Sequence, residues 1–202
     1  LAGGEVDRAT QPYEVCLRCH GDSPNQPASN TPRQLSQSNI RLKIQPNNPS
    51  FHPVAGPGRN TTVPSLISPL SQLSIIECID CHNSSSAASA GGDGPEGPHG
   101  SAFSPLLVRN YSTLDNTVES AANYALCYGC HSRDSILADE SFAGHDKHIR
   151  EENAPCSVCH DAHGISSTQG NDTNNSHLIN FDISVVMPNA SGMLRFVDQG
   201  ET

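Results

Sequence analysis

The stretch that decides the architecture is CLRCH at residues 16–20, in which two thiols three residues apart are followed directly by a histidine. The pattern returns as CIDCH at 78–82, CYGCH at 127–131 and CSVCH at 156–160. These four motifs use all eight cysteines of the 202-residue chain. Because no cysteine is left over, we expect a single kind of chemistry to account for every thiol.

Three common uses of paired thiols fit this pattern less well. A disulfide framework does not require a histidine after every second cysteine, and neither does a zinc site built from C-x-x-C pairs. A thioredoxin-like redox pair would occur once, beside a strand–helix–strand pattern. C-x-x-C-H is instead the attachment signature of c-type haem.

The spacing of the motif has a physical reason. The two thiols form thioethers with the two vinyl groups on one edge of the porphyrin, and a histidine in the next position lies under the iron as its proximal ligand. We therefore expect four haem c groups in this chain. The attachment residues are Cys16, Cys19, Cys78, Cys81, Cys127, Cys130, Cys156 and Cys159, and the proximal ligands are His20, His82, His131 and His160.

Haem would also supply a core that the side chains alone do not. Hydrophobic residues make up 35% of the chain, there is no Trp, and Gly and Pro number 16 and 15, against a typical apolar share of roughly 45–50% on a count that includes Gly. Ordering each residue costs about 1.5 kcal/mol, so large apolar groups tied to the chain would help to offset that cost. We predict a mostly irregular chain with a few short α-helices and minimal β-structure, wrapped around its haems.

Charge and hydropathy exclude some classes of protein. The net charge is −10 with only 11 Lys plus Arg, which disfavours nucleic acid as a partner because phosphate binding draws on clustered basic residues. No apolar run approaches the ~20 residues of a membrane-spanning helix. The first four residues, LAGG, do not resemble a signal peptide, and we expect them to be the mature end of an exported chain.

We expect one tetrahaem domain over residues 1–202. Its haem modules cover roughly residues 1–77, 78–113, 114–140 and 141–181, followed by a tail at 182–202.

The local patterns predict little regular structure within these modules. Residues 21–77 carry nine prolines, which favours extended and turn structure, with one short helix near 65–76. Residues 83–101 read as a flexible Gly- and Ser-rich linker, and residues 114–131 are the best helix candidate. We also expect one short helix within 141–163, ending before Pro155, and weak β-character at 181–186 and 193–197.

Each iron has a second axial position, and six of the ten histidines remain after the proximal four. We expect distal ligands among His52, His99, His148 and His163. His145 is a further candidate because it shares a helix face with His148, and His177 has the least support. Met187 and Met193 are expected to be ordinary apolar residues rather than ligands. Bis-histidine ligation leaves no open iron site for a substrate, so we expect electron transfer at low to middle potential and no enzymatic activity.

The chain resembles the OmcE-like tetrahaem outer-surface c-type cytochromes and, in its second half, the wider doubled-CxxCH cytochromes. The resemblance covers most of residues 13–181. It rests on the four motifs in their contexts, namely SFHPVAGPGRN (50–60), CIDCHNS with GPHGS (78–101), ALCYGCHSRDSIL (125–137), FAGHDKHI (142–149) and CSVCHDAHG with HLINF (156–181).

The resemblance implies an extracellular or outer-surface filament, a nanowire, in which subunits of a homopolymer stack to form a continuous haem chain. It also implies that a distal histidine can be donated between subunits, and that other cytochromes or extracellular electron acceptors are partners. Two other hypotheses stay open from the residues themselves. One is a monomeric periplasmic tetrahaem shuttle, and the other is a multihaem reductase with one open iron.

Overall fold

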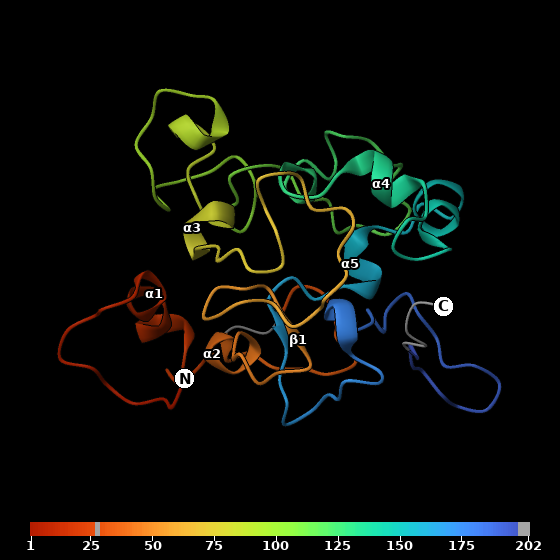
Figure 1. Cartoon of the computed structure of the whole chain (residues 1–202), viewed down its shortest axis with the longest axis horizontal. Coiled ribbons are helices and arrows are strands. Elements are labelled where there is room, and N and C mark those ends of the chain that lie inside the picture. The colour runs from red at the N-terminus through yellow and green to blue at the C-terminus, as the bar shows by residue number, and fades with distance from the viewer. Residues whose placement is uncertain (27–28, 198–202) are drawn as a thin grey trace. The chain divides into compact units, whose positions relative to one another are not determined.

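The computed structural model describes residues 1–26 and 29–197, and these form two compact units (Figure 1). Unit 1 combines Leu1–Thr61, Gln72–Ile75 and the segment from Cys156 onward, whereas unit 2 combines Thr62–Ser71 and Ile76–Pro155. Unit 1 therefore holds the first and fourth motifs, and unit 2 holds the second and third. The expectation of one tetrahaem domain stays a prediction.

Regular structure is sparse, which confirms the predicted class of a mostly irregular chain with short helices and minimal sheet. The α-helices are α1 (Pro12–His20), α2 (Ile40–Lys43), α3 (Cys78–Cys81), α4 (Arg133–Leu137) and α5 (Cys156–Cys159). The 3₁₀ turns are η1 (Ala88–Ala90), η2 (Cys127–Gly129) and η4 (Ser176–Leu178), and η3 (Lys147–Glu151) is one π-helical turn. The two strands are β1 (Ser50–Phe51) and β2 (Gly164–Ile165).

Local capping explains where two of the short helices begin. In α1, Gln11 and Glu14 form a reciprocal capping box and Pro12 occupies the first turn, where its missing N–H costs nothing. In α3, Glu77 and Asp80 form the same kind of box. Both boxes lie at cysteine motifs, so the sequence fixes a helical turn at the thiols without a long helix around it.

Unit 1 is built around the antiparallel pair β1 and β2, in which Ser50 faces Ile165 and Phe51 faces Gly164. The apolar core around this pair is small and consists of Ile44, Phe51, Val158, Ile165 and Ile179. The buried side-chain amide of Asn180 satisfies both backbone groups of Leu35, as a neighbouring strand would. It accepts a hydrogen bond from the Leu35 N–H and donates one to the Leu35 carbonyl, both at 2.9 Å.

Gly164 is required where the strands meet, and its replacement by alanine is expected to destabilise unit 1. Its φ is +136°, and a Cβ would collide with the Lys43 carbonyl and lie 2.8 Å from Phe51 Cα. Backbone strain and overpacking each cost about 1–3 kcal/mol, so Gly164→Ala should lower the free energy of unfolding by about 3 kcal/mol. Denaturant unfolding measures this. Gly58→Ala is the control, because its Cβ would meet only the Gln72 carbonyl at 3.5 Å, and equal losses in both variants would contradict the argument.

Unit 2 buries Leu107, Val108, Tyr124, Leu137 and Ile149. The flexible linker expected at 83–101 is instead a closed, hydrogen-bonded loop. The buried Asn83 amide donates to Glu96 Oε2 at 2.5 Å and accepts from the Gly97 N–H at 2.6 Å, while Glu96 Oε1 accepts from the Ser89 N–H at 2.8 Å. A few polar side chains inside a Gly- and Ser-rich segment are enough to fix its path.

The helix predicted over 114–131 is wrong. The segment forms turns, with only the η2 turn at its end, and Leu114 and Val118 are 76% and 68% exposed. Side chains bond the local backbone instead, as Thr117 Oγ1 donates to the Leu114 carbonyl at 2.6 Å and Asn123 Nδ2 donates to the Val118 carbonyl at 2.8 Å. Such bonds compete with helical hydrogen bonds, and Asn116 has a φ of +62° that interrupts a helix.

The other local expectations have mixed outcomes. No helix lies at 65–76, and no strand lies at 181–186 or 193–197, where Asp182 makes only an isolated bridge with Arg33. The helix expected within 141–163 corresponds to η3, which ends before Pro155 as predicted, and α5 follows that proline. The extended and turn structure predicted for 21–77 is confirmed apart from α2 and β1, within the residues described there.

Candidate functional site

Each pair of thiols lies on one helical turn. The thiol pairs of the first, second and fourth motifs are held by α1, α3 and α5, and the pair of the third motif is held by η2. The turn closes on the following histidine, whose N–H bonds the carbonyl of the first cysteine at 2.8 Å in the second motif and 2.9 Å in the third and fourth. Residues three apart on a helix share a face, so both thiols of a motif are presented together. None of the eight cysteines is fully buried.

Three of the four histidines that follow the cysteine pairs, which we expect to be proximal ligands, have a ring nitrogen held by a second residue. His82 Nδ1 lies 3.2 Å from the Pro105 carbonyl, and His160 Nδ1 lies 2.8 Å from the His177 carbonyl. His131 Nδ1 lies 2.9 Å from Ser65 Oγ. A carbonyl can only accept, so it fixes the proton on Nδ1 and leaves the Nε2 lone pair for a metal. Histidines that bind metals nearly always have such a partner on the other nitrogen.

Two spare histidines share this arrangement. His52 Nδ1 bonds the Ala162 carbonyl, and His148 Nδ1 bonds the Gly144 carbonyl at 2.6 Å. Burial lowers the pKa of His52, partly opposed by the Ala162 bond and by nearby Asp161, which favours the neutral imidazole that ligation requires. In both residues the backbone carbonyl occupies Nδ1, which leaves Nε2 as the atom that could bind a metal.

His52 and His163 lie at the end of the β1–β2 pair. The His52 N–H donates to the His163 carbonyl at 3.3 Å, which continues the register of the two strands. Directly opposed residues in an antiparallel pair carry their side chains on one face, with Cβ atoms about 4.5–5.5 Å apart. Two candidate ligands therefore lie next to the β1–β2 pair, joined by this backbone hydrogen bond within unit 1.

The ring of Phe142 packs against two further candidates in unit 2. It stacks on His148 with a centroid distance of 6.1 Å and meets His145 edge-on at 5.4 Å. Gly144 allows this approach, because a Cβ there would lie 2.9 Å from the Phe142 ring and 3.2 Å from His148 Nδ1. His145 Nδ1 has a longer contact to Ser141 Oγ, 3.4 Å, so His148 is the better fixed of the two imidazoles.

The remaining candidates are placed less directly. His99 lies in unit 2, and its ring packs close to Gly97, since a Cβ on that glycine would lie 3.2 Å from His99 Nε2. His177 contributes its backbone carbonyl to His160, a role that no sequence pattern indicates. The methionines considered as alternative ligands are exposed, Met187 at 75% and Met193 at 42%. Each unit thus holds two proximal histidines and three spare ones.

The second and third motifs are neighbours within unit 2. The consecutive residues Val108 and Arg109 contact one motif each. The Val108 N–H donates to the Cys81 carbonyl at 2.8 Å, and the Arg109 guanidinium lies against Gly129. Burial raises the pKa of the Cys81 thiol to about 11, with further contributions from Cys130 and Asp80. Groups attached to these two thiol pairs would therefore lie close together.

Apolar side chains beside the thiols are left uncovered. Val15, next to Cys16, is 67% exposed, and Ile79, between Cys78 and Cys81, is 39% exposed. A porphyrin bonded to these cysteines would cover such side chains at about 25 cal/mol for each Å² buried. Paired thiols, oriented imidazoles and uncovered apolar contacts all fit haem c.

The chain matches no protein-family model, no curated protein and no solved structure in the comparisons made with each. Within residues 1–26 and 29–197, no group of three or more His, Cys, Asp or Glu side chains converges as a site for a bare metal ion. No helix in the same residues is long and apolar enough to cross a membrane.

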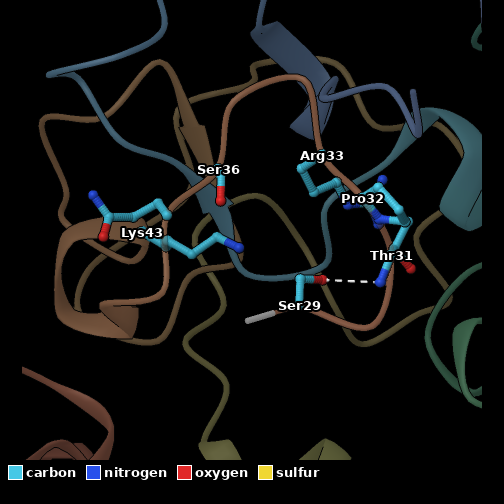
Figure 2. Close-up of a pocket in the computed structure, with 7 residues that line it drawn as sticks. Ser29, Thr31, Pro32, Arg33, Ser36 and Lys43 are labelled. Atoms are coloured by element: carbon cyan, nitrogen blue, oxygen red, sulfur yellow. Dashed lines mark hydrogen bonds between the residues drawn. The ribbon is translucent and has the colours of Figure 1, made fainter. Parts of the chain in front are cut away.

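A polar network surrounds the fourth motif in unit 1. The Lys43 ammonium forms a buried ion pair with Asp161 at 2.6 Å, and both side chains are less than 8% exposed. Lys43 and Arg33 also line a pocket of about 330 Å³ together with neighbouring Ser, Thr and Gln side chains, which Figure 2 shows. Sequence reasoning missed all three charged residues, because the partners that Lys43 and Arg33 bind lie more than 100 residues away along the chain.

Proposed function

We propose that the chain transfers electrons through four covalently attached haem c groups and is not an enzyme. The observation that carries the proposal is the shared arrangement of the imidazoles. Proximal His82 and His160 and spare His52 and His148 all have Nδ1 held by a backbone carbonyl. A ligand is expected on both faces of an iron only where the site is meant to stay closed to substrates.

Haem c, when bound, supplies a one-electron carrier. The chain's own part is to hold the thiols on one face of each turn, to fix the tautomer of the imidazoles and to exclude water from the apolar contacts. The neighbouring second and third motifs support transfer, because closely spaced carriers exchange electrons readily. We assign the distal positions to His52, His99, His148 and His163. His145 is the alternative ligand.

We further propose that the protein is a subunit of an extracellular filament for long-range electron export. This part rests on the resemblance of the four motif contexts to OmcE-like cytochromes. A distal histidine donated by a neighbouring subunit would then make coordination part of assembly. A monomeric periplasmic shuttle is the second candidate function, and it requires the same closed irons without the polymer.

The proposal is tested on protein purified from a host that attaches haem. Intact mass should show four haems per chain, and the oxidised protein should show low-spin iron only. Electron microscopy at high protein concentration should show filaments. Monomers would contradict the filament, while iron that takes up cyanide or carbon monoxide at one haem would favour the reductase hypothesis.

Replacing His52 by alanine is expected to open one iron. The oxidised protein should gain a high-spin signal equivalent to one of its four haems, read by electron paramagnetic resonance, with the haem count unchanged. His177→Ala is the matched control from the same unit, because its backbone carbonyl rather than its ring supports His160. A high-spin signal in the control but not in His52→Ala would reverse the assignment.

A further inference from the structure

Arg33 binds the backbone of the fourth motif through three hydrogen bonds. Its Nη1 donates to the carbonyls of Ser157 at 2.6 Å and Asn180 at 2.8 Å, and its Nη2 donates to the carbonyl of His160 at 2.9 Å. Two of these carbonyls belong to the motif itself. The third belongs to the segment that also bonds the motif, since the Asn180 N–H donates to the Cys159 carbonyl at 2.8 Å. The guanidinium is therefore fixed against the residues that would carry a haem.

The charges packed around this site have both signs, because the buried acidic side chain of Asp182 lies on the segment bridged to Arg33 and opposes part of the effect of a cation there. Lys43 and Asp161 form a buried ion pair that cancels, and Arg33 adds one further cation. The bonded carbonyls of Ser157 and His160 lie on either side of Cys159 in the chain, so the guanidinium is held against the backbone that flanks this cysteine.

We infer that Arg33 is a positioning residue that raises the reduction potential of the haem held by the fourth motif. The inference rests on the proposed function, because it requires haem at Cys156 and Cys159. Reduction of ferric to ferrous iron adds one electron and removes one positive charge from the iron. A fixed cation nearby disfavours the more positive, ferric form, and more so where burial reduces the local dielectric constant. Arg33 also lines the pocket of about 330 Å³, and solvent in that pocket would screen part of the effect.

The test is a potentiometric titration of the full chain with Arg33→Gln and Arg33→Lys. Arg33→Gln removes the charge, so one of the four one-electron steps should move to lower potential while three stay in place. Arg33→Lys keeps the positive charge but loses the three hydrogen bonds of the guanidinium. The reduction potential of this step should therefore stay close to that of the unmodified protein. The step that moves must be the one missing from a Cys156→Ala/Cys159→Ala variant.

Arg59→Gln is the matched control, because this arginine of the same unit also bonds a backbone carbonyl, that of Asn48 at 2.7 Å, but contacts no motif. Its titration should coincide with that of the unmodified protein. The inference is overturned if Arg33→Gln retains four haems and an unchanged titration, or if Arg33→Lys shifts as far as Arg33→Gln. If Arg33→Gln loads fewer haems, its fully loaded fraction is separated and titrated, and an unchanged titration of that fraction overturns the inference. An unmodified chain without four haems would instead overturn the proposed function.

Discussion

Replacing Cys156 and Cys159 together by alanine is expected to leave three haems per chain instead of four. Both thioethers of the fourth motif are then lost, and His160 alone would have to hold the porphyrin. Intact mass should fall by one haem, and the haem absorbance per chain should fall by about a quarter. The variant should also unfold at lower denaturant, because a group bonded at two thiols and one iron restricts the unfolded chain as a cross-link does.

The residue between these cysteines provides the control. Ser157 is fully buried, and its hydroxyl finds no hydrogen-bond partner among the described residues. Ser157→Ala removes an unsatisfied polar group without changing the thiols, so it should keep four haems and lose no stability. Four haems in the double-cysteine variant would contradict covalent attachment at this motif. A loss of haem in Ser157→Ala would attribute the effect to packing.

Asp161→Asn is expected to destabilise unit 1 by about 3–5 kcal/mol, because it leaves the buried Lys43 ammonium without its counter-charge. Burial by itself would raise the pKa of Asp161, but the charge and hydrogen bond of Lys43 and the charges of Arg33 and His163 more than offset it and lower the pKa. The carboxylate is therefore the charged partner that the site requires. Denaturant unfolding of the haem-loaded protein measures the loss.

Two further variants make this prediction specific. Asp172→Asn removes the acid of an exposed ion pair with Arg59, which should cost less than about 1 kcal/mol. Lys43→Met combined with Asp161→Leu replaces the pair by apolar side chains of similar size, and it should recover most of the stability lost in Asp161→Asn. Equal losses in Asp161→Asn and Asp172→Asn would show that burial of the Lys43 pair is not what matters.

The sequence predicted what depends on local pattern. A thin apolar composition and many prolines indicated an irregular chain, and the paired thiols are presented together on helical turns as haem attachment would require. His52, one of the expected distal ligands, does have an oriented ring. The wrong helix at 114–131 followed apolar spacing and the capping residues Asp115 and Thr117 at its start. Short polar side chains such as Thr117 and Asn123 decided that segment by bonding the nearby backbone.

What sequence reasoning could not find are the contacts between distant segments. Arg33 bonds carbonyls 124, 127 and 147 residues away, and Asn180 closes on Leu35 across 145 residues. Nothing in the residues near Arg33 or Leu35 indicates these partners. The pairing of His52 with His163 depends in the same way on β1 and β2, each only two residues long, too short to leave a periodic signal.

The division of the chain between the two units also sets an order for maturation. Apart from Thr62–Ser71, unit 2 is one continuous stretch that ends at Pro155, whereas unit 1 joins residues near the N-terminus to those from Cys156 onward. A ribosome completes the continuous unit first, and nearby segments close faster than distant ones. The first motif need not wait for the end of this process, because the hydrogen bonds to its Arg18 and Cys19 carbonyls come from nearby Ser23 and Gln26. The fourth motif, in contrast, completes unit 1 only when it joins segments synthesised more than 100 residues earlier.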